Sequence, residues 1–89
     1  MIGFTVGSSM IPTHGKINLI RITKQKSYKI GDIISLKCKD HKFYCHRIQK
    51  INNFLVSTKG DNLAQQNYEK NVSVMNIEGI VKLLWKIRR

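Results

Sequence analysis

The sequence predicts a small, mostly β domain in which antiparallel strands form a curled sheet or partial barrel. Apolar and β-branched residues recur in short runs with strand periodicity, and turn-forming pairs such as Gly-Asp and Asn-Asn separate these runs. Helical periodicity fits poorly, except in residues 80–89, where the period is ambiguous. Because 89 residues supply apolar surface for only one core, we expect a single domain over residues 1–89.

Clear turn signals separate the expected strands. The runs with strand character are residues 2–7, 16–23, 33–38, 43–51, 54–59 and 72–87. In residues 16–23 the apolar positions 17, 19 or 20, and 22 alternate with polar ones. The sequence KDHK at residues 39–42 predicts a hairpin loop. Residues 63–71 are polar and predict a loop or a single helical turn.

The charge of the chain is strongly positive. Lysine and arginine total 16 against 5 acidic residues, a formal net charge of +11. Such a surface attracts nucleic acid, anionic lipid or an acidic partner, although the basic residues are spread along the chain rather than gathered in one stripe. No apolar run approaches the ~20 residues that span a bilayer. The first residues also lack the charged start of an export signal.

The two cysteines do not predict a disulfide scaffold or a metal site. Cys38 and Cys45 flank the expected hairpin loop, and with His41 and His46 they form a Cys-x-x-His-x-x-x-Cys-His cluster. This spacing fits no standard zinc finger, and adjacent residues of a strand point to opposite faces. We therefore expect neither a metal nor another cofactor.

Three positions bear the residue types of nucleophilic catalysis. Ser9 lies in the turn sequence GSSMIP, His46 lies in an otherwise apolar strand, and Asp61 follows a glycine at the end of a strand. A serine hydroxyl needs an adjacent base to become a nucleophile. Neutral imidazole can serve as that base, and a carboxylate can fix its tautomer. Each residue type also has an ordinary role in a turn or a core, and spacing alone leaves both interpretations open.

Five short motifs, in order, resemble the type I signal peptidases of the archaeal and endoplasmic-reticulum branch. They are GSSMIPT, YKIGDII, CHRI, STKGDN and IEGIV, and together they extend from Gly7 to about Val81. The resemblance implies the curled β catalytic core of that family, with Ser9 as nucleophile, His46 as general base and Asp61 as the acid that orients it. It also implies cleavage of an extended peptide after small residues, in an Ala-x-Ala pattern.

The same resemblance assigns supporting roles around the nucleophile. Met10 and Pro12 would shape the turn together with Ser8, and the backbone N–H of Ser9 would donate to the oxyanion. Some bacterial members carry a serine two places before the nucleophile as a second donor. Gly7 occupies that position in this sequence and lacks the hydroxyl.

Two departures from the family pattern bear on activity and location. Relatives of this branch carry a second aspartate about six residues after the Gly-Asp pair, where this sequence has Asn67, with Glu69 close but displaced. Relatives also hold the core at the bilayer with a transmembrane anchor, and this chain starts about where such an anchor would end. The resemblance implies a location at the membrane or its extracytoplasmic face, with a peptide or preprotein as substrate and an anionic membrane surface or an anchored protein as partner.

Other readings belong to different functional classes. A degenerate peptidase core that binds nucleic acid would suit the net charge, and Phe43 and Tyr44 could stack on bases. A membrane-associated scaffold that presents substrates is a third reading. Among the remaining residues, Asp32 is expected to form a turn, His14 and His41 to be solvated, and Trp85 to lie in the core or at a partner contact.

A histidine base also predicts pH dependence. If His46 accepts the Ser9 proton, cleavage should fall as the pH drops through a value near the ~6.5 of free imidazole.

Overall fold

A computed structural model describes residues 1–65 and 68–87, and these residues form one sheet of seven strands. The strands are β1 (Ile2–Val6), β2 (Ile17–Thr23), β3 (Ile33–Lys37), β4 (Phe43–Asn52), β5 (Leu55–Lys59), β6 (Tyr68–Ser73) and β7 (Ile77–Ile87). A short 3-10 turn, η1 (Val74–Asn76), connects β6 to β7.

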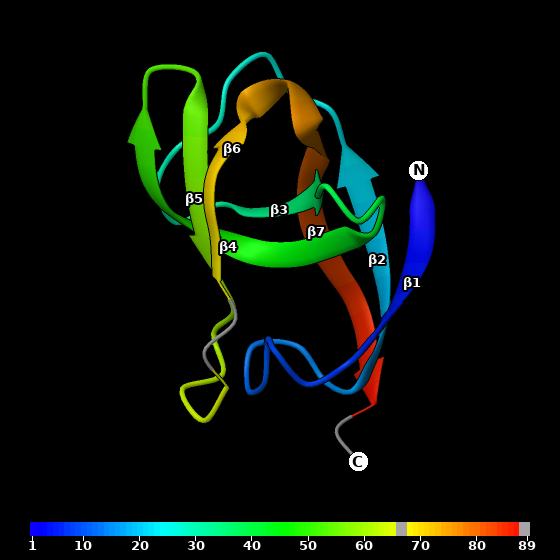
Figure 1. Ribbon diagram of the computed structural model, residues 1–89. Coiled ribbons are helices and arrows are strands. Elements are labelled where there is room, and N and C mark those ends of the chain that lie inside the picture. Colours follow the sequence, from blue (N-terminus) through cyan, green and yellow to red (C-terminus); the bar gives the residue numbers. More distant parts are fainter. Residues whose placement is uncertain (66–67, 88–89) are drawn as a thin grey trace.

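The sheet is antiparallel throughout and curls into a half-barrel, which confirms the predicted fold class. Its strand order is β1-β2-β7-β3-β4-β5-β6, so β1 and β6 are the edge strands. The long strand β7 lies in the middle of this order because it pairs with both β2 and β3. Figure 1 shows β4 crossing the molecule while β1 and β6 bound the two sides of the curled sheet.

The core lies on the inner face of the curl and draws on most of the central strands. Its main cluster is aliphatic, and every member is almost completely buried: Ile34, Leu36, Ile48, Val56 and Ile77. In β3 the sequence IISLK buries three successive residues, as is typical of a strand covered on both faces. Tyr28, Val72 and Val74 pack at the edge of the cluster.

Of the two positions that the apolar pattern of β2 left open, 19 and 20, Ile20 is the buried one. Asn18 and Ile20 are buried, whereas Ile17 is exposed. Side chains alternate across a strand, so once Ile20 enters the core Asn18 must point the same way. Asn18 is accommodated there because its amide satisfies backbone groups of the preceding loop.

The expectations for the C-terminal part of the chain were right only in part. Residues 68–71, expected in a loop or helical turn, belong to β6, which pairs with β5. Tertiary pairing overrides the weak local preference of this polar segment. Residues 80–87, where the period is ambiguous, are strand throughout. Trp85 is 55% exposed and therefore does not belong to the core.

Several large apolar side chains remain on the surface of β1 and the end of β7. They include Phe4, Val6, Leu84 and Trp85. Over the described parts of the chain, no helix is long and apolar enough to cross a membrane.

Candidate active site

Ser9 lies in the loop that leaves the edge strand β1 and returns as β2. Gly7 opens this loop with a φ of 136°, a conformation that favours glycine, and its N–H donates to Lys16 O at the other end of the loop. Within the loop, the N–H of Ile11 donates to Ser8 O and that of His14 to Met10 O. The sequence GSSMIPT therefore forms a tight, internally bonded turn.

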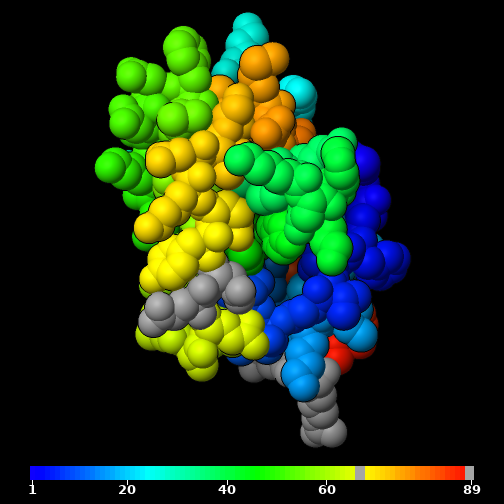
Figure 2. Space-filling model, in the orientation of Figure 1, coloured from blue at the N-terminus to red at the C-terminus, as the bar shows by residue number. Residues whose placement is uncertain are grey.

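The segment that follows β5, far away in the sequence, contacts this turn directly. The Asn62 backbone N–H donates to Ser9 O, and the Asn62 side-chain amide donates to Ser8 O, both at 2.8 Å. The Asp61 N–H donates to Sδ of Met10, which is buried, as a turn-shaping role requires. Pro12 is exposed, and the peptide bond that precedes it is cis. Figure 2 shows this yellow-green segment lying against the blue loop of residues 7–16, which is called the nucleophile loop below after the expected role of Ser9.

The turn brings Ser9 to His46, as the resemblance implies. His46 Nε2 lies 2.9 Å from Ser9 Oγ, although these residues are 37 positions apart in the chain. On the other side of the imidazole, Nδ1 lies 2.5 Å from Glu69 Oε1. With a carboxylate accepting from Nδ1–H, Nε2 carries the lone pair and can accept the serine proton. Ser9, His46 and Glu69 thus form one hydrogen-bonded chain.

A second hydrogen bond, from a buried residue of β5, fixes the position of Glu69. Thr58 Oγ1 donates to the same oxygen, Glu69 Oε1, at 2.6 Å, and Thr58 is 2% exposed. The register pairs Thr58 directly with Glu69 across β5 and β6. His46 and Glu69 are 3% and 11% exposed, so their contact is largely shielded from water.

The expectation that Asp61 orients His46 was wrong. The Asp61 carboxylate accepts from Arg47 Nε at 3.0 Å and from Arg47 Nη2 at 2.8 Å. It also accepts from Thr13 Oγ1 at 2.5 Å. Because Arg47 follows His46 in β4, its side chain leaves the opposite face of the strand and draws Asp61 away from the imidazole.

Asp61 instead ties the nucleophile loop to β4. The Arg47 guanidinium, with the Thr13 hydroxyl in support, holds the pKa of the Asp61 carboxyl below its usual range against an opposing effect of burial. The same pair raises the pKa of Arg47. Arg47 also donates to Gly31 O, in the turn that Asp32 stabilises by accepting from the Lys29 N–H. Asp32 therefore forms the expected turn.

Glu69 is the site residue that the sequence motifs missed. The family pattern points to position 67, and Asn67 lies outside the described residues. Glu69 lies in β6, in a segment that local sequence preferences do not mark as a strand. A signal did exist, because Glu69 is the single carboxylate between Asp61 and Glu78 in the sequence.

His14 was expected to be solvated, and it is 3% exposed instead. Burial lowers its pKa, despite the nearby Asp61 carboxylate, which acts in the opposite direction. Beside it, Asn18 donates to Gly15 O and to Thr5 Oγ1 and accepts from the Gly15 N–H. This buried amide closes the base of the nucleophile loop. His41 is exposed, in agreement with the sequence expectation.

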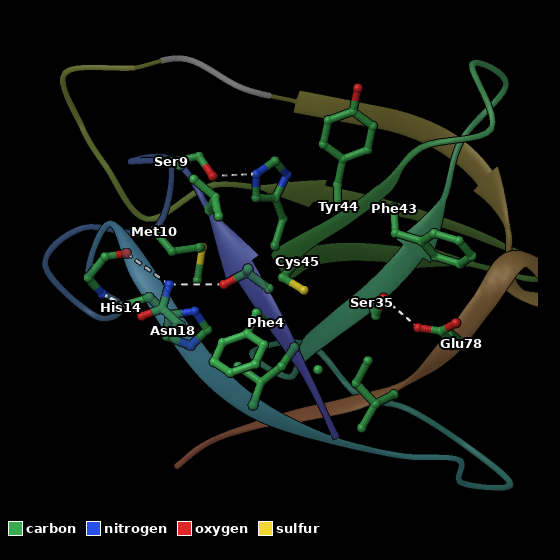
Figure 3. Close-up of a pocket in the computed structure, with 18 residues that line it drawn as sticks. Phe4, Ser9, Met10, His14, Asn18, Ser35, Phe43, Tyr44, Cys45 and Glu78 are labelled. Carbon is green, nitrogen blue, oxygen red and sulfur yellow. Dashed lines mark hydrogen bonds between the residues drawn. The ribbon is translucent and has the colours of Figure 1, made fainter. Parts of the chain in front are cut away.

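A cleft of about 340 Å³ runs from Ser9 along the inner side of the sheet. Two continuous stretches line it, residues 3–7 of the β1 edge and residues 43–46 at the start of β4. β1 pairs only with β2, and β5 joins β4 only from Arg47 onward. The cleft therefore has backbone edges on two sides, with Ser9 at one end (Figure 3). His46, which also lines the cleft, is hydrogen-bonded to Ser9 there.

Beside the Ser9 hydroxyl, the described residues leave a backbone donor available. The Ser9 N–H donates to no other described residue and is thus available to a ligand. The Ser8 hydroxyl accepts from Gln65 Nε2 at 2.6 Å, so it is engaged with the segment after β5. Gly7 adds no hydroxyl.

The cysteine and histidine pairs around the β3–β4 hairpin do not assemble. No group of three or more His, Cys, Asp or Glu residues suited to a metal occurs in residues 1–65 and 68–87. His46 faces Ser9, and both cysteines are free. Burial raises the pKa of Cys45 to about 11, so this cleft-lining thiol is a poor nucleophile near neutral pH.

No family model, curated protein or solved structure matches the chain. The residues and their geometry therefore carry the functional proposal.

Proposed function

We propose that this protein is a serine endopeptidase of the signal peptidase type. The observation that carries the proposal is the hydrogen-bonded chain from Ser9 Oγ through His46 to Glu69, at 2.9 Å and 2.5 Å. A buried imidazole between a hydroxyl and a carboxylate is the arrangement that nucleophilic acyl transfer requires. Its position at the end of a cleft gives a peptide access to the hydroxyl.

The proposed reaction proceeds through an acyl-enzyme. His46 Nε2 takes the proton of Ser9 as the hydroxyl oxygen attacks the peptide carbonyl, and the Ser9 N–H donates to the oxyanion. Glu69 stabilises the imidazolium that forms. The imidazolium then gives its proton to the leaving amine. Water, deprotonated by His46, hydrolyses the ester and restores Ser9.

The cleft suits an extended substrate. A peptide lying between residues 3–7 and 43–46 can pair with the free edge of β1 and with the uncovered start of β4. In the proposed mode, the residues before the cut run along β1 away from Ser9. The small side chains in the family pattern, Ala-x-Ala, would occupy positions next to the nucleophile turn. The exposed apolar residues of β1 suit an approach to an anionic membrane surface, as the resemblance implies.

Cleavage of a fluorogenic Ala-x-Ala peptide tests the proposal. We expect the wild-type protein to cleave this peptide, with detergent or anionic lipid present, and the Ser9→Ala and His46→Ala variants to lose at least about 1,000-fold in kcat/KM. Acylation of Ser9 by a serine-directed phosphonate, detected by mass, would identify the nucleophile independently.

The adjacent serine supplies the matched control. Ser8 differs from Ser9 by one position but bonds to Gln65 rather than to His46, so Ser8→Ala should lose less than about tenfold. Equal cleavage by wild type and Ser9→Ala would refute the proposal. So would a folded wild-type protein that cleaves no member of an Ala-x-Ala peptide library.

Nucleic-acid binding is the second candidate function, favoured by the net charge of +11. The cleft that holds Ser9 is lined by no described lysine or arginine, so such binding would use another face. It would weaken steeply with salt because phosphate contacts release counterions. Binding to single-stranded DNA that is retained in Ser9→Ala would support this function if its affinity falls steeply between about 50 mM and about 200 mM salt.

A further inference from the structure

The end of the cleft opposite Ser9 holds a single carboxylate. Glu78 of β7 lines the cleft there, and Figure 3 shows it across the cleft from Ser9 with Ser35 and Phe43 nearby. Ser35 Oγ donates to Glu78 Oε1 at 3.0 Å, which fixes the carboxylate while leaving most of its acceptor capacity open.

The charge of this cleft contrasts with that of the whole chain. The protein has 16 lysines and arginines against 5 acids, yet the described residues that line the cleft include no lysine or arginine and one acid, Glu78. The described lining of the cleft therefore has the opposite charge balance from the chain as a whole, which favours a positively charged group of a ligand there.

Among the residues that the structure describes, no cationic side chain forms an ion pair with Glu78. The ion pairs found within the described residues are His46–Glu69 and Arg47–Asp61. Lys37 of β3 pairs with Phe43 of β4 in the strand register. Its ammonium group lies 6.0 Å from the centroid of the Phe43 ring and forms no ion pair with Glu78. A carboxylate with open acceptor positions is a suitable receptor for an ammonium or guanidinium group.

The strand register indicates how many substrate residues separate Glu78 from the reacting bond. The Met1 amino group donates to Ile22 O, and a Cβ on Gly79 would lie against Ile22 and Thr23, so Glu78 belongs to the Met1 end of β1. A peptide paired with β1 advances at about 3.3 Å per residue, as the strand does. Because β1 has five residues between this end and the Ser9 loop, and because a lysine or arginine side chain is long, the side chain that reaches Glu78 is about three to five positions before the cut.

We propose that Glu78 is a specificity residue that selects a lysine or arginine side chain about three to five positions before the cleaved bond. The proposal rests on the endopeptidase function, because it uses the same cleft and the same direction of the substrate. It names a substrate class: peptides with a basic residue followed by small residues at the cut.

Peptide binding to the Ser9→Ala variant tests this without requiring turnover. The probes are fluorescein-labelled Ala-x-Ala decapeptides with one lysine, or its neutral isostere norleucine, at each of positions two to six before the cut. We expect lysine to bind about tenfold tighter than norleucine at one or two adjacent positions. That ratio should fall to near one in Ser9→Ala/Glu78→Gln, as measured by fluorescence anisotropy.

Two further variants make the test specific to position 78. Ser9→Ala/Asp32→Asn removes the same charge from a turn outside the cleft and should keep the lysine preference. Ser9→Ala/Glu78→Lys should prefer glutamate to lysine at the same position. Circular dichroism checks that each variant is folded.

The outcomes separate this inference from the proposed function. A lysine preference that is absent, or that persists after Glu78→Gln, overturns the inference even if the wild-type protein cleaves every peptide. A preference that depends on Glu78, without cleavage by wild type, supports the recognition site and refutes the endopeptidase. Absence of measurable binding by every peptide counts against the inference.

Discussion

At the residue scale, the functional question concerns which carboxylate acts on His46. Asp61 and Glu69 both follow β5, and the sequence motif favours Asp61. In the folded chain, Glu69 accepts from the imidazole and from Thr58, whereas Asp61 is bound by Arg47 and Thr13. Each carboxylate therefore has a separate set of partners: Glu69 contacts the imidazole of the proposed base, and Asp61 ties two segments together.

Substitution of the two carboxylates distinguishes these tasks. Glu69→Gln removes the charge that stabilises the imidazolium, and we expect kcat to fall at least about 100-fold with little change in KM. Glu69→Asp should restore part of the loss. Asp61→Asn should lower kcat by less than about tenfold at a temperature where both variants are folded. A larger loss in Asp61→Asn than in Glu69→Gln would return the orienting role to Asp61.

The thiol of Cys45 provides a second prediction at this scale. Burial raises its pKa to about 11, so little thiolate exists at pH 8. In a Cys38→Ser protein, iodoacetamide should therefore modify Cys45 about 100-fold more slowly in the folded state than in urea. Mass spectrometry of quenched samples gives both rates. Equal rates in the folded and unfolded protein would show that the thiol is accessible and ordinary.

At the scale of elements, the site depends on contact between two loops that are far apart in the sequence. The loop after β1 carries Ser9, and the segment after β5 contacts it through Gly60, Asp61 and Asn62. Gly60 is buried, and a Cβ built on it would lie 2.5 Å from Ser9 O and 3.1 Å from Ser9 Cβ. The absence of a side chain at position 60 thus allows the nucleophile turn to approach β5.

Gly60→Ala should move the nucleophile. Because the clash involves backbone, we expect a loss of about 1–3 kcal/mol in the free energy of unfolding and a fall in kcat under conditions where the variant is folded. Urea unfolding and peptide cleavage measure the two effects. Gly3→Ala is the control for stability, since a Cβ on Gly3 meets nothing within 4 Å. A Gly60→Ala protein with wild-type stability and activity would contradict the close approach.

At the scale of the whole molecule, one curled sheet brings three separate strands to the site. β4 supplies His46, β6 supplies Glu69, and the edge strand β1 leads into Ser9. The Arg47–Asp61 pair crosses between β4 and the segment after β5, and Thr13 extends the connection to the nucleophile loop. The Arg47–Asp61 ion pair should therefore contribute to the free energy of unfolding.

The Asp61 contact predicts a pH-dependent part of that stability. Its folded-state pKa is lowered, chiefly by the hydrogen bonds from Arg47, so the stabilisation is complete above the unfolded value of ~3.9 and disappears as the pH falls through the folded value. Asp61→Asn should cost about 1–2 kcal/mol at pH 7 and progressively less below about pH 4.

A double-mutant cycle assigns this effect to the pair. Asp61→Asn and Arg47→Gln, measured by urea unfolding, should be coupled by about 1 kcal/mol at pH 7 and uncoupled once the carboxyl is protonated. A coupling energy that stays the same at a pH below the folded-state pKa of Asp61 would mean that the charge of Asp61 does not contribute.

The sequence by itself determined the fold class and six of the strand segments, because alternation and turn residues are local signals. The approach of Ser9 to His46 was implied by the family resemblance and not by these local signals. Tertiary structure alone decided the rest. Asn18 and His14 became buried because the nucleophile loop folds over them, and residues 68–73 became β6 because an uncovered β5 edge accepted them. That pairing set Thr58 opposite Glu69 and brought its carboxylate to His46. Cross-strand register depends on contacts between residues distant in the chain, which no local pattern encodes.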